Sequence, residues 1–272
     1  MIRGLDKWKE HFAAYANNYV LIGGAACNLL EEEYAQNPRA TKDLDLILVV
    51  EVLSADFGKR FWDFIKQGKY TSRQRGENKH EYYRFMNPED VTYPKQVELF
   101  SRKAGVLQLP GDARIEPIHI EDDLSSLSAI LMDDDYYNFT IEHSILFDEI
   151  HIANVEALIC LKAKAYNDLY ARKNAGEKVD GRDIEKHKKD VLRLAAMIAE
   201  DAIFELPVAM KADLQLFSDT VADNLPNSDF MKSIGLTGMN SSSLLDVVRK
   251  SFSLWQGDAV RQMAFDMYFT WE

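Results

Sequence analysis

The stretch from Arg39 to Val50, RATKDLDLILVV, places the strongest constraint on the fold. Its last four residues form a continuous apolar run, which is typical of a strand covered on both faces. Asp43 and Asp45 stand two residues apart just before that run, so in a strand both side chains project from the same face. Two carboxylates at the edge of a core repel each other and lose hydration, so their presence needs a physical reason.

The hydrophobic pattern around this stretch predicts an α+β fold. We expect an N-terminal core with a mixed β-sheet flanked by helices, followed by a mostly helical C-terminal region. The boundary is expected at residue 150, which gives domains 1–150 and 151–272. Helices are predicted over the first dozen residues, 25–34 and 55–67, and strands over 18–24, 42–50, 81–86 and 95–100.

Composition narrows the class of protein. Hydrophobic residues make up 47% of the chain and charged residues 28%, which is typical of a soluble globular protein. The formal net charge of -12 argues against coating nucleic acid through overall charge, although a local basic patch could hold RNA. The charged first ten residues and the lack of a long apolar stretch lead us to expect neither a signal peptide nor a membrane span. Cys27 and Cys160 are expected to be buried free thiols, which points to a reducing cytoplasm.

A glycine pair and a further carboxylate accompany the two aspartates. The strand before Gly23 and Gly24 leads into a helix, so backbone N–H groups at this turn can approach a phosphate closely. Glu98 lies within a later strand, so Asp43, Asp45 and Glu98 would stand on adjacent strands and repel one another. A divalent cation removes that repulsion, and the oxygen ligands predict a Mg²⁺ (or Mn²⁺) site with one ion or two.

Three stretches carry a family resemblance: Gly23-Gly24, RATKDLDL from Arg39, and VELF from Val97. In this order they resemble the nucleotidyltransferase superfamily related to polymerase beta, and most closely its AbiEii-type branch. The resemblance covers roughly residues 19–102. Gly24 departs from the serine that many polymerase-beta-like enzymes have in the phosphate turn, whereas AbiEii-type proteins often have glycine there. The resemblance implies transfer of a nucleoside monophosphate from an NTP, with release of pyrophosphate.

The resemblance also implies roles for individual residues. The glycine pair would bind the triphosphate, and the three carboxylates would hold the metal, with Glu98 also helping to deprotonate the acceptor hydroxyl. Arg39 and Thr41 lie just before the aspartates, where they would either touch phosphates or cap the strand.

The helical half offers a second set of candidates. Helical spacing places Lys162 on an apolar stripe, where it would either extend its amine to solvent or meet an anion such as the triphosphate. Lys162–Ala165 matches a Lys-x-x-Ala motif of the AbiEii-type pattern. Residues 186–191 match its Lys-Asp-x-x-Asp-hydrophobic motif, with His187 in place of the first Asp. The resemblance implies that Lys162 and Asp190 line the nucleotide site, with Asp190 orienting a group or acting as base. His187 would be either a core residue or a support for them.

Charge runs elsewhere favour simpler interpretations. The run Asp133-Asp134-Asp135 belongs to an acidic segment that we expect to be a solvated face or a loop, and it lacks the glycine of an EF-hand. Basic residues gather between Lys59 and Lys103, including Arg84, and again over 161–193. They would either hold an RNA end or be scattered solvated charge.

The sequence therefore predicts a magnesium-dependent nucleotidyltransferase. Its acceptor would be an RNA, such as a tRNA end, or a protein, and the resemblance suggests a toxin or phage-defence component with an antitoxin partner. One alternative is a transferase that modifies a small molecule of the aminoglycoside kind. Another is a catalytically silent nucleotide-binding or interaction protein, against which the three retained carboxylates argue.

Overall fold

The computed structural model describes residues 2–34, 36–38, 41–77, 80–101, 116–117, 133–236 and 239–255. The chain is α+β, as the sequence predicted. It divides into two compact units, Met1–Leu161 and Lys162–Glu272, and the boundary falls inside helix α6 (Val155–Asn174). In the described ranges, no helix has the length and apolar character that crossing a membrane requires.

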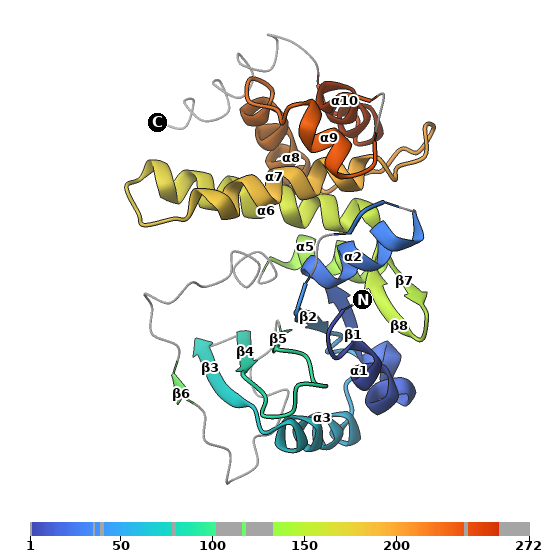
Figure 1. Ribbon diagram of the computed structural model, residues 1–272, viewed down its shortest axis with the longest axis vertical. Coiled ribbons are helices and arrows are strands. Elements are labelled where there is room, and N and C mark those ends of the chain that lie inside the picture. Colours follow the sequence, from blue (N-terminus) through green and yellow to red (C-terminus); the bar gives the residue numbers. More distant parts are fainter. Residues whose placement is uncertain are drawn as a thin grey trace. The chain divides into compact units, whose positions relative to one another are not determined.

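The first unit is built on a mixed sheet (Figure 1). Its strand order is β6-β3-β4-β5-β2-β1-β8-β7. Strand β2 runs parallel to β5, and β1 runs parallel to β8, whereas β1 and β2 are antiparallel, as are β4 and β5. The strands are β1 (Tyr19–Ile22), β2 (Asp43–Leu48), β3 (Thr71–Glu77), β4 (His80–Met86), β5 (Gln96–Ser101), β6 (Glu116–Pro117), β7 (Ser144–Phe147) and β8 (Ile150–Ala153).

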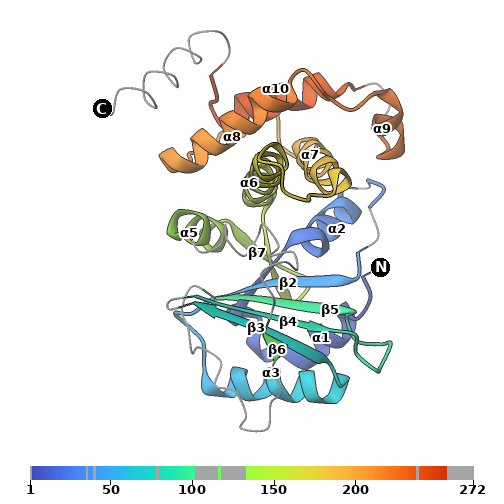
Figure 2. The ribbon, with the colours of Figure 1, turned by 90° about the vertical axis from the view of Figure 1, so that its left-hand side faces the viewer.

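Helices cover both faces of this sheet (Figure 2). Helices α1 (Leu5–Phe12) and α3 (Ala55–Gly68) lie on one face, and α2 (Gly23–Glu33) and α5 (Asp134–Glu142) lie on the other. A 3-10 helix, η1 (Ala13–Asn18), joins α1 to β1. The side chain of Ser54 caps α3 by accepting a hydrogen bond from the backbone N–H of Phe57, which fixes where that helix begins.

The face toward α1 and α3 carries an aromatic core, which we call the aromatic face. Phe61 is fully buried, and its ring contacts those of Trp8, Phe12 and Phe85. The spacing of aromatic residues along α3 places them on one side of that helix, which the sequence predicted over residues 55–67. The members are Trp8, Phe12, Tyr19, Phe57, Phe61, Phe64 and Phe85.

The acidic run at 133–135 begins a helix. The Asp133 side chain accepts hydrogen bonds from the backbone N–H groups of Asp135 and Tyr136, at 2.9 and 3.3 Å. Asp134 and Asp135 occupy the first turn of α5, where their negative charges interact favourably with the positive end of the helix dipole. All three aspartates are exposed, so the run is solvated as expected, and its role here is to cap α5.

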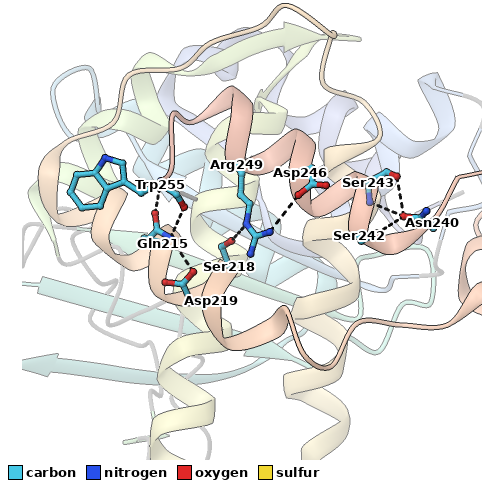
Figure 3. A network of polar contacts seen from close by, with 9 residues as sticks. All are labelled: Gln215, Ser218, Asp219, Asn240, Ser242, Ser243, Asp246, Arg249 and Trp255. Atoms are coloured by element: carbon cyan, nitrogen blue, oxygen red, sulfur yellow. Dashed lines mark hydrogen bonds and ion pairs between the residues drawn. The ribbon is translucent and has the colours of Figure 1, made fainter. Parts of the chain in front are cut away.

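The described part of the second unit is helical, as predicted. Besides the end of α6, it contains α7 (Gly181–Ala195), α8 (Val208–Val221), α9 (Ser228–Ser233) and α10 (Ser241–Ser251). A polar network joins α8 to α10 and the segment after it (Figure 3). Arg249 donates to the Ser218 hydroxyl at 2.8 Å, and the Gln215 side chain exchanges two hydrogen bonds with the backbone of Trp255.

Candidate functional site

The glycine turn and the second aspartate meet at the start of α2. Ile22 and Asp45 are paired in register across β1 and β2, so Gly23 follows directly beside Asp45. Gly23 has a φ of +66°, and a Cβ added to it would lie 1.9 Å from Asp45 Oδ2. Glycine is required at this position, both by its left-handed backbone and by the close approach of the carboxylate. Two stretches that are separate in the sequence therefore form one local site.

The charged residues of β2, β5 and β4 share one face of the sheet. Phe85, Val97 and Leu44 form a row of register partners, and Phe85 packs against α3 on the aromatic face. Successive side chains in a strand alternate between faces, so the next row projects from the opposite face. That row consists of Asp45, Glu98 and Arg84, and Asp43 pairs with Gln96 two residues along. We call these five residues the carboxylate face.

Glu98 is held by two donors on this face. Its Oε1 accepts hydrogen bonds from Arg84 Nε and from Gln96 Nε2, both at 2.7 Å. Glu98 is only 3% exposed, and the Arg84 side chain is 13% exposed. Arg84 therefore supplies positive charge beside Glu98, and it is not a scattered solvated charge, which was one of the two interpretations of the sequence. Only the strand register, which pairs Arg84 with Glu98, reveals this contact.

Asp43 and Asp45 are the residues best suited to hold a metal ion. Both are half-buried, and both belong to the same face of β2. Among the residues that the structure describes, no three His, Cys, Asp or Glu side chains form a group able to hold a metal ion. Mg²⁺, however, is usually bound by one or two carboxylates together with water and substrate phosphates. An ion held by these two aspartates would need water or substrate oxygens to complete its coordination.

Thr41, Arg39 and Gly24 are the remaining candidates of the first unit, and all three precede β2 in the sequence. Thr41 is half-buried and lies two residues ahead of Asp43. Arg39 lies outside the described residues. Gly24 is the second residue of α2, where backbone N–H groups have no partner within the helix and favour an anion.

Lys162 and Asp190 form a buried ion pair in the second unit. Lys162 Nζ lies 3.1 Å from Asp190 Oδ2, and the two residues are 2% and 4% exposed. The anion that Lys162 meets in the structure is therefore a carboxylate of the same chain, whereas the anion predicted from the sequence was the triphosphate. His187 is buried one turn before Asp190 on α7. A buried pair of this kind is costly to break by removing one partner.

Many basic residues of α6 and α7 are engaged with acidic partners. Lys164 pairs with Asp213 at 2.8 Å, and the buried Lys188 pairs with Glu185 at 2.7 Å. Arg182 donates to Asp180, and this hydrogen bond lowers the pKa of Asp180 to about 2. These residues are thus paired with carboxylates of the same chain, and the prediction that the basic residues hold an RNA end stays a prediction.

Compared with protein-family models, curated proteins and solved structures, the chain gives no significant match. The residues and their placement are therefore the basis for inferring function. The most informative feature is the contact between the glycine turn and Asp45, with Asp43 on the same strand face and Glu98 in register beside Asp45.

Proposed function

We propose that this chain is a magnesium-dependent nucleotidyltransferase, which moves a nucleoside monophosphate from an NTP to an acceptor. The observation that supports it best is the approach of Asp45 to Gly23. A turn suited to phosphates and a carboxylate suited to a cation lie against each other, which is the combination that a metal-bound triphosphate needs. The resemblance to AbiEii-type nucleotidyltransferases agrees with this combination.

In this proposal the chain binds and orients the triphosphate. The backbone N–H groups of Gly23 and Gly24 would bind phosphate oxygens at the positive end of α2. Asp43 and Asp45 would hold Mg²⁺, which supplies charge neutralisation for the departing pyrophosphate. The roles predicted for Thr41, Arg39, Lys162 and Asp190 stay predictions.

The reaction balances with the NTP and a hydroxyl acceptor alone. The acceptor oxygen forms a bond to the α-phosphorus, and the bond from that phosphorus to the β-phosphate oxygen breaks. Pyrophosphate leaves with the bonding electron pair, and the hydroxyl proton passes to a base. The acceptor class predicted from the sequence is an RNA end or a protein side chain. A toxin role with an antitoxin partner, and a small-molecule acceptor, stay predictions.

One observation favours a second candidate function. Glu98, a predicted metal ligand and base, is engaged with Arg84 and Gln96. A protein that binds a nucleotide without transferring it needs no carboxylate poised to accept a proton. The silent nucleotide-binding protein is therefore the competing proposal, and only a transfer assay separates the two.

Titration calorimetry tests the binding step that both candidates share. We expect each NTP that serves as substrate to bind in the presence of Mg²⁺ and to lose this binding when EDTA is added. Asp43→Asn and Asp45→Asn should each weaken binding by at least about tenfold, because each removes a charged oxygen ligand. Asp223→Asn, at an exposed aspartate of the second unit, is the matched control. Parent-like binding by both site variants would contradict the proposed site.

A further inference from the structure

The carboxylate of Glu98 is hydrogen-bonded to Arg84, whereas a carboxylate that serves as a metal ligand directs its oxygens toward the ion. Arg84 and Gln96 both donate to the same oxygen, Oε1, at 2.7 Å, and Glu98 is almost fully buried. Hydrogen bonds between charged groups at this distance are strong, and a buried carboxylate needs such partners. A metal ion at Glu98 would therefore be limited to Oε2, on a carboxylate whose charge Arg84 already balances.

The strand register places Arg84 near the proposed triphosphate. Strand β5 separates β4 from β2, so Arg84 and Asp45 stand two strand spacings apart, or roughly 10 Å between their backbones. The Arg84 side chain reaches Glu98, which is the direct neighbour of Asp45. Its Nε makes the contact with Glu98. A guanidinium held in one orientation loses less conformational entropy when it binds phosphate.

We propose that Glu98 is a positioning residue for Arg84, and that Arg84 binds the triphosphate of the nucleotide. Glu98 then lies outside the metal's coordination, and Asp43 and Asp45 hold the ion together with the phosphates. This inference depends on the proposed nucleotidyltransferase function, because it assigns Arg84 to the same nucleotide. Binding of phosphate by Arg84 would explain why a buried ion pair is present on the carboxylate face, because an apolar pair of similar size would pack there equally well.

Two binding measurements test this assignment without any turnover. The first measures Mn²⁺ binding to the nucleotide-free protein by electron paramagnetic resonance, and the second measures NTP binding in the presence of Mg²⁺. The main variant is Glu98→Gln/Arg84→Met, which removes both charges and leaves the net charge unchanged. We expect its Mn²⁺ affinity to stay within about threefold of the parent and its NTP affinity to fall by about tenfold or more. Asp45→Asn should lose both.

A conservative variant keeps the test valid if the double variant unfolds. Arg84→Lys retains the positive charge and loses the guanidinium fork, so NTP binding should fall several-fold while Mn²⁺ binding is unchanged. Arg182→Met, at an exposed arginine, is the control and should change neither measurement.

Each contrary result has a distinct meaning. Loss of Mn²⁺ binding in the double variant would show that Glu98 is a metal ligand and would overturn the inference. Parent-like binding of both Mn²⁺ and NTP in the double variant and in Arg84→Lys would show a purely structural pair, which also overturns it. If the parent protein binds neither Mn²⁺ nor any NTP, the proposed function fails, and this inference fails with it.

Discussion

The two faces of the sheet in the first unit differ in what holds their residues in place. Strands β2, β4 and β5 contribute to both, because successive side chains alternate between faces. On the aromatic face, Phe85 packs into a cluster of rings between the sheet and α3. On the carboxylate face, the neighbouring Arg84 bonds to Glu98, and Asp45 lies against Gly23.

Within each of these strands, the side chains on one face contribute to stability and the alternate side chains contribute to the proposed function. Close packing holds the residues of the aromatic face in place, so they stabilise the fold through burial and ring contacts. On the carboxylate face, the residues are held by an ion pair, by hydrogen bonds and by the close approach of Asp45 to the backbone at Gly23. We therefore expect substitutions on the first face to change the free energy of unfolding. Substitutions on the second should mainly change the binding of cations and nucleotides.

The largest effect on stability is expected at Phe61. Phe61→Ala removes a fully buried ring and leaves a cavity among aromatic neighbours, which should lower the free energy of unfolding by about 3–5 kcal/mol. Urea denaturation at pH 7 measures this change. Val91→Ala, at a residue that is 73% exposed, is the control and should stay within about 0.5 kcal/mol. A loss below about 1 kcal/mol at Phe61 would remove the basis for the contrast between the faces.

The second effect tests the contact between the glycine turn and Asp45. Gly23→Ala adds a Cβ at a left-handed position and against Asp45 Oδ2, so it should cost about 1–3 kcal/mol of stability. In the double variant Gly23→Ala/Asp45→Ala the contacts with Oδ2 and Cγ disappear, whereas the 3.0 Å approach to the Cβ of residue 45 and the backbone strain remain. A double-mutant cycle should therefore give a coupling of at least about 0.5 kcal/mol. Simple additivity of the two changes would show that the residues do not touch.

A smaller change in stability is expected at Asp45 itself. Asp45→Asn keeps the size of a half-buried side chain and removes a negative charge beside Glu98, so the free energy of unfolding should change by less than about 1 kcal/mol. Mn²⁺ binding, measured on the same sample, should be lost. A large loss of stability with retained Mn²⁺ binding would assign Asp45 to the structural role that we give to the aromatic face.

The smallest effect concerns pH and lies at the margin of the aromatic face. Burial of His11 beside Phe12 and Phe64 lowers its pKa, against a hydrogen bond to the Arg60 carbonyl oxygen that raises it. A lowered pKa in the folded state means that the unfolded chain binds the proton more readily. The stability contributed by neutral His11 is then present above pH 6.5 and declines as pH falls through the lowered pKa. Urea unfolding between pH 7.5 and 5 should show a weaker pH dependence in His11→Gln than in the parent. An equal dependence would contradict this role.

Local patterns in the sequence were enough to predict several elements. The spacing of aromatic residues indicated α3, and the two aspartates before an apolar run indicated a strand with both carboxylates on one face. Helices were predicted for the second unit, and its described part is helical. In each case the information lies within one turn or one strand, where side-chain period decides the structure.

Contacts between distant strands could not be predicted in this way. The pairing of Arg84 with Glu98 depends on the register of β4 and β5, and the contact of Gly23 with Asp45 depends on that of β1 and β2. Strands β7 and β8 are four residues long and follow an acidic segment, so no periodic signal marked them. Asp190 could not be predicted as the partner of Lys162 either. Helical spacing places the lysine on one side of its helix, but it does not identify the residue that packs against it.

The most direct test of the proposed function is transfer of label from an α-labelled NTP. The parent protein and its Asp43→Asn/Asp45→Asn variant would each be incubated with every NTP in turn, Mg²⁺, total RNA and cell extract. We predict that the parent labels an RNA or a protein and that the variant does not. Tight Mg²⁺–NTP binding without label from any NTP would contradict the transferase and favour the silent nucleotide-binding protein. Equal labelling by parent and variant would contradict the assignment of Asp43 and Asp45.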